Sequence, residues 1–232
     1  MIAFFRLLLI LIAAPPIPLG ATEADETPKS GLPKVVIVGD SIRLSYASVV
    51  SKQLAGKAIV ISPRANGGDS NNVLKHLDEW VISEKPAIVH FNCGIHDTKR
   101  FKSTSKFQVS PERYEANLRE IVGRIRSETG ATVLFATTTP IHDARAAQIR
   151  KDRDYELLDA SVERYNAIAE KVMQQLTVPV NDLHAAVSNP GEAGETEDLI
   201  AADGVHLTTA GRQLIGETVA AFIARQLAAD GK

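Results

Sequence analysis

The amino-acid sequence predicts an α/β fold, a three-layer α/β/α sandwich built around a five-stranded parallel sheet. Five short apolar runs alternate with longer amphipathic segments along the chain. Most of these runs are continuously apolar rather than alternating, which is typical of parallel strands buried on both faces. Five strand–helix units in succession favour right-handed crossovers, which place helices on both faces of the sheet.

The apolar runs are the expected strands, namely Lys34–Val38, Ala58–Ser62, Ala87–Phe91, Thr132–Ala136 and Val178–Asn181. The helices expected between and after them are Arg43–Leu54, Asn72–Ser83, Pro111–Ser127, Tyr155–Gln175 and Thr208–Leu227. The third helix has Ser110 as a suitable N-cap, Pro111 in its first turn and Gly130 as a stop signal.

Residues 1–21 have the pattern of a secretory signal peptide. Arg6 and the amino terminus supply positive charge, and the apolar run Leu7–Ala14 is too short to span a bilayer. Prolines and small residues follow, so we expect cleavage near residues 21–24 and a secreted or periplasmic protein. An uncleaved membrane anchor is the alternative. Residues 22–33 are polar and read as a linker, and residues 34–232 form the single expected domain.

The composition argues against one partner class and against an intrachain disulfide. The chain has 26 basic and 28 acidic residues, a net charge of -2, and removal of Arg6 with the leader makes this 25 against 28, or -3. No basic stripe stands out, so nucleic acid is not an expected partner. Cys93 is the only cysteine and cannot form an intrachain disulfide, so we expect a small buried hydrophobe.

Gly39-Asp40-Ser41 directly follows the first expected strand and precedes a helix. In a parallel α/β sheet, ligands bind beyond the carboxyl ends of the strands. A serine at this turn presents its hydroxyl there, with its own N–H near a helix N-terminus that favours developing negative charge. The alternative is that Ser41 only caps the helix.

Asp203-Gly204-Val205-His206 lies just before the last expected helix. A serine nucleophile needs a base that takes its proton and a carboxylate that orients this base. Their three-residue separation lets one short turn supply both. Taken singly, His206 could be a helix-entry residue and Asp203 an ordinary turn residue.

Two further polar segments follow expected strands, Asn66-Gly67-Gly68-Asp69-Ser70 after the second and Asn92-Cys93-Gly94-Ile95-His96-Asp97 after the third. A glycine can leave its backbone N–H open to an oxyanion, although both glycine positions could serve turn formation alone. For Asp97 we favour a role as an acceptor that orders its loop.

These four segments resemble the four signature blocks of the SGNH (GDSL-like) hydrolase superfamily, in order and over essentially the whole mature chain. The resemblance implies a flavodoxin-like sandwich, with Ser41, Asp203 and His206 as the catalytic residues. It also points to Gly68, in Gly68-Asp69-Ser70, rather than Gly67 as the oxyanion glycine. The third block of the family reads Gly-x-Asn-Asp, and here His96 stands at the position of the oxyanion-binding Asn. An imidazole can donate through Nε2–H in one neutral tautomer and in the charged form.

The predicted function is that of an exported serine esterase. Ser41 attacks the carbonyl, His206 relays the proton, Asp203 orients His206, and the N–H groups of Ser41 and Gly68 with His96 bind the oxyanion. Because no long apolar flap suggests a lipase, we expect a small acyl group, acetyl on a carbohydrate. An acyltransferase with the same site and a non-catalytic binding protein on the same fold are the alternatives.

The remaining polar and aromatic residues indicate no further chemistry. His90, His142 and His184 match no metal-site spacing, so we expect neither metal nor cofactor. Trp80 is expected to pack in or at the edge of the core. The Arg-rich segment of residues 140–154 follows the fourth strand and is expected to be a lid or specificity loop, or else an ordinary solvated loop.

Overall fold

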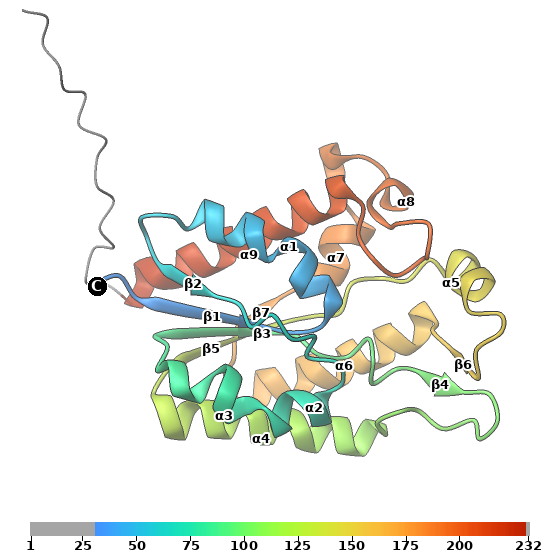
Figure 1. Cartoon of the computed structure of the whole chain (residues 1–232), viewed down its shortest axis with the longest axis horizontal. Coiled ribbons are helices and arrows are strands. Elements are labelled where there is room, and N and C mark those ends of the chain that lie inside the picture. Colours follow the sequence, from blue (N-terminus) through green and yellow to red (C-terminus); the bar gives the residue numbers. More distant parts are fainter. Residues whose placement is uncertain (1–30, 231–232) are drawn as a thin grey trace, which may run out of the picture. The chain divides into compact units, whose positions relative to one another are not determined.

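A five-stranded parallel sheet forms the middle layer of the protein (Figure 1). The computed structural model describes residues 31–230. The strands lie in the order β2-β1-β3-β5-β7, and every neighbouring pair is parallel. Their bounds are β1 Lys34–Val38, β2 Ile59–Ile61, β3 Ile88–Phe91, β5 Thr132–Ala136 and β7 Val180–Asn181. The predicted α/β sandwich is confirmed, and all the carboxyl ends of its strands lie at one edge of the sheet.

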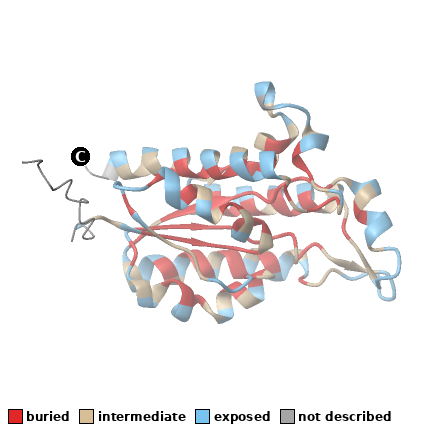
Figure 2. Ribbon diagram, turned by 45° about the horizontal axis from the view of Figure 1, so that its top comes forward, coloured by how far each residue is buried: buried red, intermediate tan, exposed pale blue. Residues whose placement is uncertain are grey.

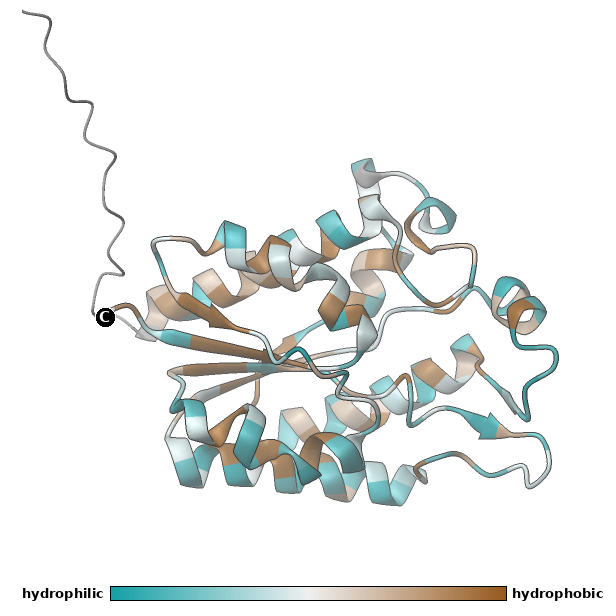
Figure 3. Cartoon of the chain, in the orientation of Figure 1, coloured by the Kyte–Doolittle hydropathy of each residue, from teal (hydrophilic) through white to brown (hydrophobic). Residues whose placement is uncertain are grey.

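Helices cover both faces of this sheet. One face carries α1 (Ser41–Gln53), α7 (Leu183–Ser188) and α9 (Thr209–Asp230), and the other carries α2 (Ser70–Lys75), α3 (Leu77–Trp80), α4 (Pro111–Thr129) and α6 (Asp159–Gln175). β1 serves both layers, because Val35 and Ile37 pack under α1 and α9 whereas Val36 and Val38 pack under α2 and α4. Figure 2 shows the strands buried and the helices buried on one side only. Figure 3 shows the same strands as the most continuously apolar segments.

Capping residues set the ends of α4 as the sequence predicts. The Ser110 hydroxyl accepts from the N–H of Arg113, Pro111 lies in the first turn, and Gly130 ends the helix with a φ of 72°. Cys93 is fully buried and Trp80 is 8% exposed against the core, so both packing predictions are confirmed.

The helix predicted at Asn72–Ser83 is not continuous. It breaks into α2, α3 and the 3-10 turn η1 (Ile82–Glu84). The break falls at His76, whose ring nitrogen lies 3.0 Å from the Asn72 carbonyl oxygen and whose ring stacks on Trp80. A side chain that competes for a helical carbonyl in this way favours a local end to the helix.

The helix predicted to begin at Tyr155 begins instead at Asp159. Tyr155–Glu156 form strand β6, which pairs antiparallel with β4 (Arg100–Phe101) and is joined to it by an ion pair between Arg100 and Glu156. Pairing with a distant segment overrides helical periodicity here. The segment of residues 140–154 is likewise not loop throughout, because it contains α5 (Asp143–Ile149). The η2 turn (Gly191–Ala193) and α8 (Thr196–Leu199) complete the described elements.

The predicted signal peptide lies outside the described residues, as do residues 22–30 of the predicted linker. Both stay predictions, as does the domain boundary at residue 34. None of the helices between residues 31 and 230 combines the length and the apolar character that crossing a membrane requires.

Candidate active site

Ser41 is the first residue of α1 and directly follows the turn at the end of β1. Asp40 caps the helix, with its Oδ1 accepting from the N–H of Ile42 at 2.8 Å. Gly39 makes the turn possible, because a Cβ there would lie 3.0 Å from the Cβ of Arg43 and 3.2 Å from the carbonyl oxygen of Asn92. Ser41 is therefore not the helix cap, because Asp40 fills that role and leaves the Ser41 hydroxyl available for another contact.

Ser41, His206 and Asp203 are connected by two successive side-chain contacts. The Oγ of Ser41 lies 2.9 Å from Nε2 of His206, across 165 residues of chain. Nδ1 of His206 in turn contacts Oδ2 of Asp203. The other oxygen of Asp203 accepts from the N–H groups of Val205 and His206 at 3.0 and 2.9 Å. The three residues predicted as catalytic are thus assembled in the order that proton relay requires.

The electrostatics of this turn favour a charged carboxylate. Burial raises the pKa of Asp203, but hydrogen bonds from the His206 ring and from the two backbone N–H groups outweigh it and lower the pKa overall.

The turn between Asp203 and His206 requires a glycine at position 204. Gly204 has a φ of +75°, and a Cβ there would lie 2.4 Å from the backbone nitrogen of Ala146 in α5.

The oxyanion candidates differ in how free their N–H groups are. Gly67 N–H donates to the Gly39 carbonyl oxygen at 2.9 Å and is buried. Gly68 has a φ of +61°, and its N–H donates to Oδ1 of Asn66 at 2.9 Å in an exposed bond. A substrate oxygen could replace the Asn66 side chain at Gly68 but could not replace a buried backbone bond at Gly67 without cost. No acceptor for the Ser41 N–H is found among residues 31–230.

His96 lies at the same edge of the sheet, within electrostatic reach of His206 and Asp69. Its ring is partly buried, and Nδ1 lies 3.0 Å from Nζ of Lys99. Burial and, next, the Lys99 charge lower the pKa of His96 to about 4 against the opposing effect of Asp69. The ring is therefore neutral at neutral pH.

Asp97 joins the second and third segments of the site. Its carboxylate accepts from the Ser70 N–H at 3.0 and 3.1 Å and from the Ser70 hydroxyl at 2.5 Å. Ser70 also accepts from Nδ2 of Asn117 at 2.8 Å. Burial raises the pKa of Asp97 to about 7, although the Ser70 hydrogen bonds oppose this. The prediction that Asp97 orders its loop is confirmed.

Arg43 is a supporting residue that the sequence analysis missed. Its side chain is buried, and its guanidinium donates to the carbonyl oxygens of Gly39, Pro63 and Ala65 at 2.8, 2.7 and 2.9 Å. It thereby ties the turn that carries Ser41 to the turn after β2. An arginine one helical turn after Gly39, on the buried face of α1, is the only sequence signal that could have indicated this role.

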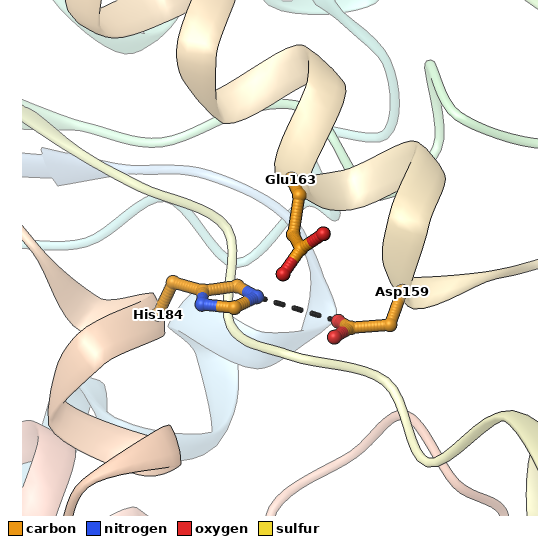
Figure 4. A group of neighbouring side chains, drawn as sticks. All are labelled: Asp159, Glu163 and His184. Atoms are coloured by element: carbon orange, nitrogen blue, oxygen red, sulfur yellow. Dashed lines mark hydrogen bonds and ion pairs between the residues drawn. The ribbon is translucent and has the colours of Figure 1, made fainter.

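His90, His142 and His184, which match no metal-site spacing, make no hydrogen bond to Ser41 within the described residues. His184 in α7 points toward Asp159 and Glu163 of α6 (Figure 4), and their ligand atoms all lie within 4.8 Å of one another. Nε2 of His184 lies 3.3 Å from Oδ1 of Asp159, which also accepts from the N–H of Ile141. This pair joins α6 to α7 and lines a cleft of about 440 Å³ that contains none of the predicted site residues. The absence of a metal stays a prediction.

His142 and His90 lie at positions where a structural role accounts for them. His142 caps α5, with its ring nitrogen 3.4 Å from the N–H of Arg145. His90 is buried in β3, and burial lowers its pKa to about 4.

A family model described as GDSL-like lipase/acylhydrolase matches residues 37–214 of the chain, from β1 to α9. The chain belongs to this family. The match includes Ser41, Gly68, His96, Asp203 and His206. The match does not test the histidine at the third block, which stays an observation on this sequence.

Solved structures of acylhydrolases have the same fold. The lipase/acylhydrolase from Enterococcus faecalis is 24% identical, with a TM-score of 0.69 over 84% of this chain and 97% of its own. The acetyl xylan esterase AlAXEase is 17% identical, with a TM-score of 0.65 over 82% of this chain and 99% of its own. Axe2, an acetylxylan esterase from Geobacillus stearothermophilus, is 19% identical, with a TM-score of 0.64 over 81% and 92%. Catalytic mutants of Axe2 with a serine or an aspartate replaced by alanine also match. No curated protein sequence matches the chain.

Proposed function

We propose that this acylhydrolase is a serine esterase in which Ser41, His206 and Asp203 form the catalytic triad. The observation that carries the proposal is the continuous contact from Ser41 Oγ through the imidazole of His206 to the carboxylate of Asp203. The serine and aspartate replaced in the catalytic mutants of Axe2 are of the same two residue types. Family membership and this contact together disfavour a non-catalytic binding protein.

The mechanism follows from the placement of protons. Asp203 accepts at Nδ1 of His206, so the proton of the neutral ring lies on Nδ1 and Nε2 is free to take the Ser41 hydroxyl proton. Ser41 Oγ then forms a bond to the ester carbonyl carbon. The charged His206 gives its proton to the alcohol oxygen as the bond between that oxygen and the carbonyl carbon breaks, which leaves the acyl group on Ser41. Water then attacks the acyl-enzyme with His206 again as the base, and the bond to Ser41 Oγ breaks to release the acid and regenerate Ser41.

The developing oxyanion needs donors where negative charge appears. We assign this role to the N–H groups of Ser41 and Gly68 and to the imidazole of His96. The N–H of Ser41 lies at the start of α1, where the helix dipole adds to its attraction for the oxyanion. The N–H of Gly68 becomes available when its hydrogen bond to Oδ1 of Asn66 opens.

The proposed substrate is a small acyl ester, acetyl on a carbohydrate. Two acetyl xylan esterases among the structural neighbours support this choice, together with the absence of a long apolar flap in the sequence. Transfer of the acyl group to another alcohol uses the same acyl-enzyme and is the second candidate. Added sugar alcohols separate the two: an acyltransferase would yield acylated sugar, and a hydrolase would yield only free acid.

The proposed activity is tested by nitrophenol release from p-nitrophenyl acetate. We expect a burst equal to the concentration of active sites, followed by slower turnover, because acylation frees nitrophenol before water attacks. Ser41→Ala should abolish the burst. The rates of hydrolysis of acetylated xylan and of longer-chain nitrophenyl esters are then compared to test the acyl group. Faster hydrolysis of the longer-chain esters would contradict the acetyl assignment.

We also propose that the protein is exported, from the charge and apolar run at residues 1–21. Intact mass of the protein from the envelope and medium of its native host tests this. A mature chain beginning near residues 22–25 supports export, whereas a membrane-bound chain that keeps residues 1–21 contradicts it.

A further inference from the structure

Lys99 and His96 form a hydrogen bond beside the proposed oxyanion site, with Nζ 3.0 Å from Nδ1. An ammonium has three N–H donors and no acceptor, so Nδ1 of His96 must accept with its lone pair. A neutral imidazole that accepts at Nδ1 carries its proton on Nε2. The contact therefore selects one of the two neutral tautomers of His96.

Lys99 is held in this position by several groups. Its Nζ lies 5.4 Å from the ring centroid of Tyr155 in β6, within reach of cation–π attraction. Its backbone N–H donates to the His96 carbonyl oxygen at 3.3 Å, and its carbonyl oxygen accepts from Gln108 at 2.8 Å. Within the described chain, no carboxylate lies close enough to pair with Nζ. The imidazole is therefore its hydrogen-bond acceptor.

The second ring nitrogen of His96, Nε2, is available to donate a hydrogen bond. Nε2 has no hydrogen-bond partner among residues 31–230. The ring lies within electrostatic reach of His206 and is neutral at neutral pH, as its lowered pKa indicates. The neutral ring thus offers one free N–H, at Nε2, near the base that acts on Ser41.

We propose that Lys99 is a positioning residue, whose ammonium keeps His96 in the Nε2-protonated tautomer that donates to the oxyanion. This inference rests on the proposed function. The other tautomer would turn a lone pair toward the developing negative charge and would repel it. A cation bonded to Nδ1 also polarises the ring, which strengthens the donor at Nε2.

Nitrogen NMR of histidine-labelled protein measures the tautomer directly. The chain has six histidines, and loss of signals in His96→Asn assigns the ring. We expect a protonated Nε2 and an unprotonated Nδ1 at neutral pH. Lys99→Met should give a mixture of tautomers and shift the titration of His96 to higher pH. Lys99→Arg should keep the wild-type pattern, because a guanidinium also only donates. Lys106→Met, which removes an exposed lysine from the same segment, is the matched control and should change nothing.

Kinetics test whether the tautomer matters. We expect Lys99→Met to lower kcat on p-nitrophenyl acetate by about 3- to 30-fold, less than complete removal of an oxyanion donor. KM should stay within about two-fold, since the donor acts mainly on the transition state. In the His96→Asn background, which has no tautomers, Lys99→Met should change kcat by less than about two-fold.

Three results would overturn the inference: a proton on Nδ1 in the wild type, an unchanged tautomer in Lys99→Met, or equal losses of kcat in both backgrounds. The last would mean that Lys99 supports the fold and does not act through His96. The NMR measurement needs no substrate, so it is independent of the esterase proposal. An inactive wild type with the predicted tautomer would refute that proposal and, with it, the catalytic role of Lys99.

Discussion

Arg150 donates from Nη1 to the carbonyl oxygen of Asp203, 2.8 Å away, and its Nη2 lies 4.0 Å from the Asp203 carboxylate. Nearby, the N–H of His142 donates to the carbonyl oxygen of Gly204 at 2.9 Å. Both contacts come from the Arg-rich segment of residues 140–154. This segment therefore supports the turn that carries Asp203 and His206, which an ordinary solvated loop would not do, and its role as a lid or specificity loop stays a prediction.

Arg150→Met should lower kcat by about 3- to 30-fold, because small displacements of a catalytic group are costly. The free energy of unfolding should fall by about 1–2 kcal/mol, since a charged donor to a carbonyl is lost. Stopped-flow kinetics and urea titration measure the two effects. Arg153→Met, at an exposed arginine three residues on, is the control. Equal kinetics for the two variants would remove the supporting role of Arg150.

His96→Ala should lower kcat by about 10²–10³, or about 3–4 kcal/mol of barrier, because one oxyanion donor is lost. KM should change much less, and His96→Asn should restore much of the loss, since an amide N–H can occupy a similar place. Because the pKa of His96 is lowered to about 4, the effect should not vary with pH above about pH 6. A folded His96→Ala enzyme within a few-fold of the wild type would leave only the backbone N–H groups as the oxyanion hole.

Gly67→Ala tests the contact between the turns after β1 and β2. A Cβ at Gly67 would lie 2.6 Å from the carbonyl oxygen of Gly39, two residues before Ser41. We expect the free energy of unfolding to fall by about 1–3 kcal/mol and kcat to fall with it. Gly56→Ala, at an exposed glycine with a φ of +74° and open space around it, should cost about 1 kcal/mol and leave kcat unchanged. The prediction fails if the two substitutions are equivalent.

The pair of His184 and Asp159 should stabilise the fold most at mildly acidic pH. The Asp159 hydrogen bond raises the pKa of His184 above 6.5, so its contribution is full below that value and is lost as the pH rises through the raised pKa. Burial raises the pKa of Asp159, but hydrogen bonds from His184 and Ile141 lower it overall, below 3.8. The Asp159 contribution is therefore full above 3.8 and is lost as the pH falls through the lowered pKa.

His184→Ala should then cost about 0.5–1 kcal/mol near pH 5.5 and less near pH 8.5, as expected for a partly exposed pair. Urea titrations at both pH values measure this. In the Asp159→Asn background the pH dependence should become much smaller, because the largest effect on the imidazolium is lost and only the weaker attraction of Asp182 and Glu163 remains. A cost that is the same at both pH values would show that His184 acts only by packing.

The sequence predicted the sheet and the residues at its edge because buried parallel strands have a strong apolar signal. β1 and β5 have the predicted bounds. The segments that follow β1, β2 and β3 do meet, through the bond of Gly67 to Gly39 and the bonds of Ser70 to Asp97. Two-residue strands such as β4 and β6 have no pattern of their own, so Tyr155 was assigned to a helix that begins only at Asp159.

The supporting contacts were beyond prediction for a different reason. Arg43 and Arg150 act through hydrogen bonds to backbone carbonyls that are distant along the chain, and Lys99 acts through a ring nitrogen three residues away in an irregular turn. Such bonds leave no spacing in a single sequence. The helix break at His76 likewise depends on a ring that binds the carbonyl of its own helix.

The central claim is that Ser41 is the nucleophile activated by His206, and labelling with a fluorophosphonate tests it most directly. Mass spectrometry of the labelled, digested protein should find one adduct, on Ser41. The rate of labelling should fall by orders of magnitude in His206→Ala, which removes the base that activates Ser41. Labelling of another residue, or labelling that persists in Ser41→Ala, would contradict the account.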